Sequence, residues 1–249
     1  MDSKNSFLTT PVAVIIGAII ISLAILIAGG IIKLGSKSTA NVAGVQVENA
    51  PPTLPQAQPT VSVSQPAPIA TDDHLRGNPK AKVIMVEYSD LECPFCKQFH
   101  QTATQAMSSY KADELAWIFR HFPLDQLHSK ARKEAEAVEC ATDLGGNDSF
   151  WKLVDKIYGV TPSNNGLNLD DLPNLAASLG LDSTKFKTCL DSDKFTQKIE
   201  DYSQAALKAG IQGTPTVFLF SAKSGEFTPV PRAVFYEDLK AAIDLALKS

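Results

Sequence analysis

The sequence feature that most constrains the fold is a pair of cysteines, Cys93 and Cys96, separated by two residues. Ahead of them, residues 82–86 form a short apolar run rich in β-branched side chains, which predicts a buried strand. After them, apolar and small side chains recur at steps of three and four residues, which predicts a helix. These side chains are Phe95, Phe99, Thr102, Ala103, Ala106, Met107 and Tyr110. The cysteine pair therefore lies at the N-terminus of a helix that follows a strand.

The helix N-terminus favours an acidic thiol at Cys93. The first amide N–H groups of a helix have no partner, and the helix dipole adds partial positive charge, so the thiolate is preferred to the thiol. Pro94 suits the first helical position, and Cys96 lies one turn further on, within reach of the Cys93 sulfur. A disulfide across so few residues is easy to reduce. An inert disulfide and half of a zinc site are the alternatives, but no second ligand pair follows at zinc-finger spacing, which favours redox chemistry.

Several longer motifs carry a resemblance to a known family. They are Cys93-Pro94-Phe95-Cys96, Gly213-Thr214-Pro215, and the segments 72–79 (DDHLRGNP), 87–90 (EYSD), 120–124 (RHFPL), 139–141 (ECA) and 150–151 (FW). With these motifs the chain resembles the thioredoxin superfamily and, within it, the DsbA-like disulfide oxidoreductases, especially their membrane-anchored bacterial branch. The resemblance extends from residue 72 to the C-terminus and implies an α/β, thioredoxin-like fold with a helical insertion. Phe95 departs from DsbA itself, which carries histidine there, and this leaves the direction and strength of the redox reaction open.

The chain is expected to comprise four parts. They are a short N-terminal tail (1–10), a transmembrane anchor (11–34), a linker rich in Pro, Ser and Gln (35–70) and a DsbA-like thioredoxin-fold domain (71–249). Residues 12–32 contain no charged side chain and are long enough to cross a bilayer as a helix. The alternative is a signal peptide cleaved at 38–40 (STA), although the apolar region of such a peptide is shorter, about 7–15 residues. In the linker, six prolines between positions 51 and 68 prevent regular packing.

Charge does not fix the orientation of this single-pass anchor, because Lys4 lies on one side and Lys33 and Lys37 lie on the other. A thiol oxidant is useful in an oxidising compartment, so we expect a cell-membrane protein whose catalytic domain lies outside the cytoplasm. The net charge of −4 and the lack of a basic stripe argue against nucleic acid as a partner.

Within the folded domain, the sequence patterns predict strands around a block of helices. The expected strands are 82–86, 115–119, 216–220 and 227–230, and a final helix is expected at 236–247. The helical insertion, at about 125–210, is expected to contain helices at 127–144, 149–158, 169–179, 183–190 and 194–209. Such a block is larger than a minimal thioredoxin fold contains, and it matches the insertion that the resemblance implies.

The implied reaction is thiol–disulfide exchange at Cys93. A thiolate of an exported, cysteine-containing client protein attacks Cys93, a mixed disulfide forms while Cys96 departs, and a second client thiol resolves it. A separate membrane redox partner must then reoxidise the enzyme, because we identify no quinone or flavin site and expect no cofactor.

The same groups working in reverse describe a reductase or isomerase. Isomerases of the superfamily resemble dimers built with an added dimerisation domain, which residues 36–70 cannot supply, so we expect a monomeric oxidase. An alternative from a different class is a non-enzymatic metal chaperone that uses Cys93 and Cys96 as ligands.

Further residues are given roles beside the cysteines. Glu87 ends an apolar run six residues before Cys93, so it is either a buried acid with a raised pKa that exchanges a proton with Cys96 or an exposed carboxylate with no role. The family has an acidic residue at this place. The resemblance also implies a cis Pro215 beside Cys93, with Thr214 pairing its backbone with the client peptide. Phe95 is the third residue expected to contact the client.

The remaining cysteines and histidines leave alternatives open. Cys140 and Cys189 are either buried free thiols or a second, structural disulfide, which some relatives have. His100 follows Cys96 by four residues on the same helical face, so it either completes a metal site with both cysteines or simply packs, and we expect packing. The other histidines that we weighed, at positions 121 and 128, lack metal-site spacing and are expected to be structural, so no metal is expected.

Overall fold

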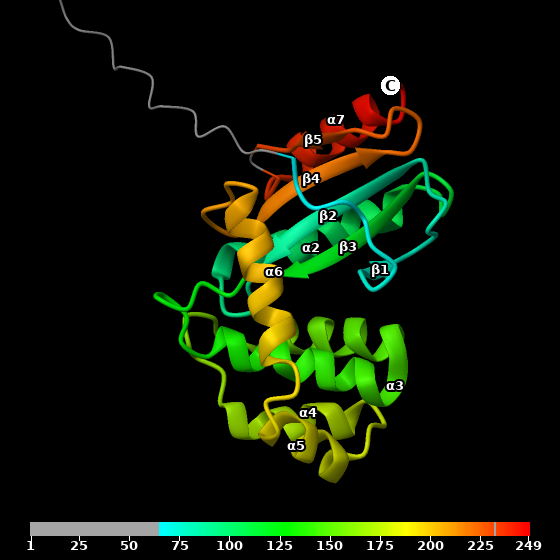
Figure 1. Cartoon of the computed structure of the whole chain (residues 1–249). Helices are drawn as coiled ribbons and strands as arrows, with labels where there is room; N and C mark the ends of the chain where they lie inside the picture. The colour runs from blue at the N-terminus through cyan, green and yellow to red at the C-terminus, as the bar shows by residue number, and fades with distance from the viewer. Residues whose placement is uncertain (1–64, 232) are drawn as a thin grey trace, which may run out of the picture. The chain divides into compact units, whose positions relative to one another are not determined.

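The computed structural model describes residues 65–231 and 233–249, which belong to one compact unit (Figure 1). The expected transmembrane anchor (11–34) and most of the expected linker (35–70) lie outside these residues. Within the described part of the chain, no helix has both the length and the apolar character that crossing a membrane requires.

The core of this unit is a sheet of five strands in the order β1-β3-β2-β4-β5. The strands are β1 (His74–Arg76), β2 (Val83–Ser89), β3 (Leu115–His121), β4 (Thr216–Ser221) and β5 (Phe227–Pro229). β2 and β3 are parallel, whereas the other three pairings are antiparallel. The two central strands, β2 and β3, are buried along their whole length. This arrangement is the thioredoxin-like α/β fold that the sequence predicted.

The alternation of side chains along β2 sorts them between two separate hydrophobic clusters. Val83 and Met85 point into a cluster with α2 (Pro94–Ser109), α7 (Tyr236–Ala246) and α3 (Ala131–Val160), whereas Ile84 and Val86 point into one at the end of α6 (Thr196–Lys208). Because Glu87 follows Met85 by two residues, its side chain lies on the same face as α2. The fold therefore directs one carboxyl group toward the helix that carries the cysteines.

The inserted helices form a layer of their own. They are α3, the 3-10 helix η1 (Leu169–Asp171), α4 (Leu172–Ser178), α5 (Ser183–Asp191) and α6. Figure 1 shows α3, α4 and α5 stacked beyond the β1–β3 side of the sheet, with α6 leading back toward it. Helical conformation breaks inside α3 at Gly146, whose φ of +73° suits glycine, so the predicted break at Gly145-Gly146 is confirmed.

A disulfide joins Cys140 on α3 to Cys189 on α5. It links residues 49 positions apart and fastens two helices of the insertion to each other. Of the two alternatives left open by the sequence, the structure contains the bonded pair.

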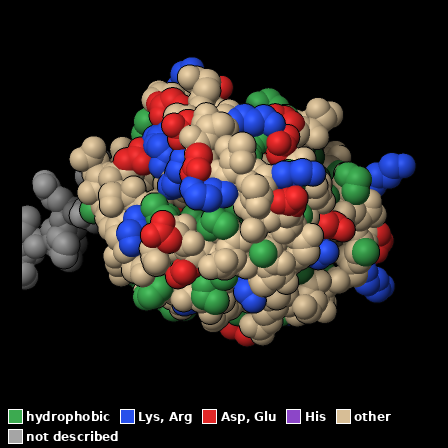
Figure 2. Space-filling view, turned by 90° about the horizontal axis from the view of Figure 1, so that it is seen from below, with side chains coloured by type: hydrophobic (Ala, Val, Ile, Leu, Met, Phe, Trp, Pro, Cys, Tyr) green, Lys and Arg blue, Asp and Glu red, His purple; other side chains and the backbone are tan. Residues whose placement is uncertain are grey.

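The outer face of the insertion carries mixed charges. Figure 2, which views the molecule from below, shows basic and acidic side chains interspersed with small apolar areas on this face. Ion pairs within the insertion include Lys187–Asp191 and Lys194–Asp143. The face that this view shows therefore has no stripe of one charge sign.

Candidate active site

The turn between β2 and α2 is held by the carboxylate of Asp90. One Asp90 oxygen accepts a hydrogen bond from the backbone N–H of Glu92 at 2.8 Å, and the other accepts one from the N–H of Leu124 at 2.8 Å. The N–H of Cys93 donates to the Asp90 carbonyl at 3.1 Å. Cys93 is the N-cap of α2, and Pro94 occupies the start of the helix as predicted. The turn thus fixes Cys93 at the positive end of a helix of 16 residues.

Cys93 and Cys96 are present as two thiols with different environments. Cys93 is 4% exposed and Cys96 is fully buried. A hydrogen bond from Cys96 is the main cause that lowers the pKa of Cys93 to about 6. Burial raises the pKa of Cys96 well above its ordinary value, and the neighbouring sulfur and Glu87 raise it further. At neutral pH the negative charge therefore lies on Cys93, while Cys96 keeps its proton.

Glu87 is fully buried. Its carboxyl group accepts hydrogen bonds from the Ser89 hydroxyl and from Nε1 of Trp117, the latter at 3.0 Å. These bonds favour the charged form, but burial outweighs them and raises the pKa of Glu87 to about 8. The Ser89 hydroxyl in turn lies 2.9 Å from the hydroxyl of Tyr158. Glu87 is therefore buried and not exposed, and its exchange of a proton with Cys96 stays a prediction.

The peptide bond between Thr214 and Pro215 is cis, in agreement with the expectation from the resemblance. It directly precedes β4, and the Thr214 carbonyl oxygen lies 3.5 Å from Sγ of Cys93. The Thr214 hydroxyl is buried without a hydrogen-bond partner in the described part of the chain. The fold therefore brings this loop into contact with the cysteine that carries the charge.

An apolar groove of about 400 Å³ runs beside this loop. Phe95 forms part of its wall and is 61% exposed, which is unusual for a phenylalanine. The groove is lined by Phe95, Thr214, Pro215, Thr216, Val217, Phe218, Pro229, Val230, Pro231, Ala233 and Val234. All three residues expected to contact a client thus meet along one surface.

His100 does not lie with the cysteines. Its Nε2 atom pairs with Oδ1 of Asp155 at 2.8 Å, and its ring packs against Trp117 and Tyr158. Among the described residues, the side chains grouped closely enough to hold a metal ion are His74, His121 and Glu139 instead. The packing interpretation of His100 is therefore the one that the structure supports.

Two buried acids near the cysteines were missed by the sequence analysis. Glu92 accepts hydrogen bonds from the N–H groups of Gly166 and Leu167, at 3.2 and 3.3 Å. Glu134 on α3 is also fully buried, and burial together with the adjacent Glu92 raises its pKa to about 10. A signal was present, because Glu134 lies on the apolar stripe of α3 that includes Ala131 and Val138.

Comparison with known proteins agrees with this geometry. A family model described as Thioredoxin (Thioredoxin_4) matches residues 70–244. DsbA2 from Pseudomonas aeruginosa, known from a crystal structure, is 29% identical in sequence to this chain, with a TM-score of 0.60. The match covers 71% of this chain and 96% of the DsbA2 chain. BdbD from Bacillus subtilis, in its oxidised form, is 25% identical in sequence, with a TM-score of 0.65. The match covers 76% of this chain and 99% of the BdbD chain.

Curated relatives match this chain over part of their length. The Na⁺/H⁺ antiporter NhaA 1 of Mycolicibacterium gilvum is 31% identical over 149 residues, which is 59% of this chain and 23% of that protein. NhaA 3 of Salinispora tropica is 33% identical over 147 residues, which is 59% of this chain and 21% of that protein. The match thus spans less than a quarter of the length of these relatives. From the family model, we conclude that the chain belongs to the thioredoxin family, and its described domain is similar in structure to DsbA-like proteins.

Proposed function

We propose that this protein is an extracytoplasmic, membrane-anchored oxidase that forms disulfides in exported proteins. The observation that carries the proposal is the lowered pKa of Cys93, about 6, beside the raised pKa of Cys96. A stabilised Cys93 thiolate stabilises the reduced enzyme, and a couple whose reduced form is stabilised is a stronger oxidant. The enzyme then gives its disulfide to clients more readily than it reduces theirs.

The reaction begins when a client thiolate attacks Sγ of Cys93 in the oxidised enzyme. A client–Cys93 disulfide forms, the Cys93–Cys96 bond breaks, and the electron pair of that bond leaves on Cys96. Because a Cys96 thiolate is disfavoured by burial, it needs a proton as it departs. Glu87, with a pKa of about 8, holds a proton at neutral pH and donates it to Cys96.

A second thiolate of the client then attacks the client sulfur of the mixed disulfide. The client disulfide forms and Cys93 leaves as a thiolate, for which its low pKa makes it a good leaving group. The client has lost two electrons and the enzyme has gained them. A separate membrane redox partner takes these electrons and restores the Cys93–Cys96 disulfide.

The client peptide lies across the apolar groove beside Cys93. Thr214 pairs its backbone with an extended client segment, next to the cis peptide bond of Pro215, and Phe95 provides an exposed apolar contact. Groups of this kind bind unfolded segments without selecting a particular sequence, because the hydrogen bonds come from the backbone and the side-chain contacts are apolar.

Two observations support the location and the anchor. Residues 12–32 contain no charged side chain, which suits a membrane span, and Cys140 and Cys189 form a structural disulfide, which persists only where the surroundings are oxidising. A domain held outside the cytoplasm by this span meets exported proteins as they emerge.

The test is the reduction potential of the Cys93–Cys96 couple, measured on the full chain in detergent against glutathione buffers. A potential above about −180 mV, the value of protein disulfide isomerase, supports an oxidase. A value at or below about −180 mV contradicts the oxidase and indicates a reductase or isomerase. Stoichiometric metal retention by the two cysteines, without turnover of a dithiol peptide, would indicate a metal chaperone.

A further inference from the structure

We propose that His74, His121 and Glu139 form a binding site for a divalent transition-metal ion such as Zn²⁺, apart from the redox cysteines. The three side chains come from β1, from the last residue of β3 and from α3. They lie 18 to 65 positions apart in the sequence, and no spacing motif joins them. The fold nevertheless brings one imidazole nitrogen from each histidine and one carboxylate oxygen within 4.8 Å of one another.

The distances suit a small metal ion. Nε2 of His74 lies 2.8 Å from Oε1 of Glu139, and Nε2 of His121 lies 3.3 Å from the same oxygen. When nitrogen and oxygen ligands bind Zn²⁺ tetrahedrally at about 2.0–2.2 Å, neighbouring ligand atoms are about 3.3–3.6 Å apart. The two nitrogen–oxygen distances therefore lie within about 0.8 Å of this range, and the two imidazole nitrogens lie no more than 4.8 Å apart. Two histidines and one glutamate are also a ligand set that zinc enzymes use, with water in the fourth position.

His121 supplies the second, independent observation. Its side chain is buried, and its Nε2 atom lies 3.3 Å from Oε1 of Glu139 but makes no hydrogen bond of good geometry with any described residue. Native structures seldom leave a buried polar atom of this kind unpartnered, since the loss costs about 1–3 kcal/mol. A metal ion between the three side chains gives this nitrogen a partner.

Aromatic neighbours hold the two imidazoles in place. The ring of His74 stacks on Phe150 with centroids 3.7 Å apart and planes 6° apart. The ring of His121 meets the edges of Phe119 and Phe150 at 5.3 and 5.7 Å. Ligands fixed in this way lose little conformational freedom on binding an ion, which favours affinity.

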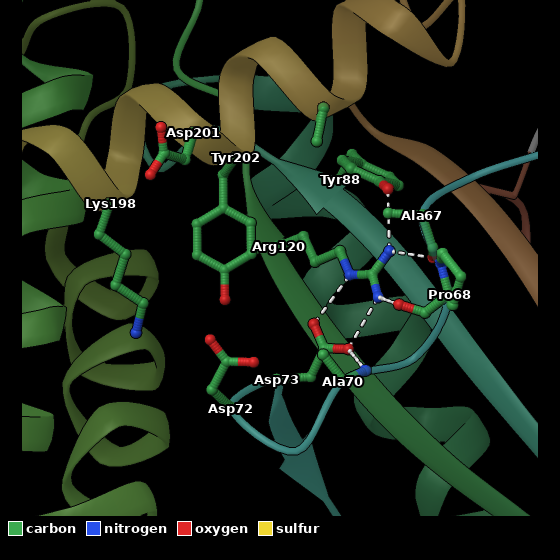
Figure 3. Close-up of a pocket in the computed structure, with 11 residues that line it drawn as sticks. Ala67, Pro68, Ala70, Asp72, Asp73, Tyr88, Arg120, Lys198, Asp201 and Tyr202 are labelled. Atoms are coloured by element: carbon green, nitrogen blue, oxygen red, sulfur yellow. Dashed lines mark hydrogen bonds and ion pairs between the residues drawn. The ribbon is translucent and has the colours of Figure 1, made fainter.

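Lys198 on α6 places a positive charge next to the proposed site, which lowers the affinity for a cation. Its Nζ atom lies 2.7 Å from Oε2 of Glu139, so it engages the oxygen that the histidines leave free. Its side chain is 30% exposed and lines a pocket of about 260 Å³. In Figure 3, Lys198 and Tyr202 extend from α6 into this pocket, toward Asp72, while Asp73 is paired with Arg120. Lys198 thus both lines this pocket and contacts Glu139, and its charge opposes the approach of a cation to the site.

The experiment is zinc titration, followed by calorimetry, of the full chain in detergent. Cys93→Ser and Cys96→Ser are introduced throughout, so that the dithiol does not bind the ion. We expect one Zn²⁺ per chain, and we expect His121→Gln and Glu139→Gln each to weaken binding at least 100-fold. His128→Gln is the matched control, because His128 is also buried and pairs with a carboxylate, that of Asp90, at 2.9 Å. It should leave the affinity unchanged.

Lys198→Gln keeps the test decisive if substitutions in the buried triad unfold the protein. Removing the lysine charge should tighten zinc binding about tenfold, and this partly exposed position tolerates glutamine. Titration with Co²⁺ should give visible absorption bands of a nitrogen and oxygen site, without thiolate bands. Absence of zinc binding, an affinity that Lys198→Gln leaves unchanged, or equal weakening by His128→Gln and His121→Gln would each overturn the proposal.

Discussion

The carbonyl oxygen of Thr214 lies 3.5 Å from Sγ of Cys93, although the two residues are 121 positions apart in the chain. The contact joins the start of β4 to the start of α2 across the end of the sheet. In the proposed function, a client peptide paired with the backbone at Thr214 would place its own cysteine next to the sulfur that it must attack.

The side chain at position 95, between the cysteines, should influence the reduction potential of the Cys93–Cys96 couple. Phe95 has no hydrogen-bond donor, so Phe95→His should stabilise the Cys93 thiolate, lower its pKa below about 6 and make the couple more oxidising. Each 1.4 kcal/mol of extra thiolate stabilisation raises the potential by about 30 mV. Equilibration with glutathione measures the change, with Phe95→Leu as an apolar control. An unchanged or more reducing potential in the histidine variant would refute this expectation.

Replacing Glu87 should remove a pH dependence of the exchange rate. With a pKa of about 8, Glu87 loses its proton as the pH rises through 8, so the first exchange step should slow there after correction for the client thiolate fraction. Glu87→Gln should lower the rate at pH 7 by about 10- to 100-fold and make the corrected profile flat. Stopped-flow kinetics with a dithiol peptide measures both effects. If the variant keeps the full rate and the same profile, Glu87 does not transfer the proton.

Glu134 should make the fold less stable as the pH rises. Its folded pKa is raised from 4.5 to about 10, so between these values the unfolded chain releases a proton that the folded protein keeps. Below pH 4.5 both the folded and the unfolded chain hold this proton, so Glu134 does not reduce the free energy of unfolding. As the pH rises from 4.5 toward 10, the free energy of unfolding falls. Glu134→Gln, which mimics the protonated acid, should therefore stabilise the protein at pH 7 by about 1–3 kcal/mol and at pH 5 by much less.

Urea denaturation at pH 5, 7 and 8.5 tests this prediction. Part of the slope with pH should remain in the variant, because Glu87 also has a raised pKa. Equal effects of Glu134→Gln at all three pH values would show that the gain does not arise from the proton.

The disulfide of the helical insertion should contribute strongly to stability. Cys140→Ala together with Cys189→Ala opens a loop between residues 49 positions apart, which in the chain-entropy model costs about 4 kcal/mol. Denaturant unfolding in the absence of reductant measures the loss. Two matched measurements with reductant provide the control, both in a Cys93→Ser, Cys96→Ser background that removes the redox couple. Reduction should destabilise the protein that keeps Cys140 and Cys189 and leave the one that lacks them almost unchanged. Free cysteines at these positions in the denatured, unreduced protein would contradict the bonded structure.

The sequence predicted the elements that depend on residues close together in the chain. The strand before Cys93, the helix after it and the break near Gly146 each follow from residues that are neighbours in the chain. β1 was not predicted, because its three residues show no alternation and are defined only by their pairing with β3. Residues 127–130, which were predicted to be helical, precede α3, which begins at Ala131.

The buried polar groups were the least predictable part. Glu92 meets Glu134, and His74 meets His121 and Glu139, only after elements distant in the chain have packed. Carboxylates and imidazoles are mostly exposed, so composition alone gave no reason to place them in the interior. His121 was expected to be structural, and its position beside Glu139 became visible only with the fold.

Four cysteines in one chain can pair in three ways, and the fold described here uses only one of them. In that arrangement Cys140 and Cys189 are joined permanently, while Cys93 and Cys96 remain free to open and close. Maturation of each molecule therefore requires an oxidant that accepts two electrons from Cys140 and Cys189 and does not return them. If the proposed function is right, the protein is itself a client of disulfide formation before it becomes a catalyst of it.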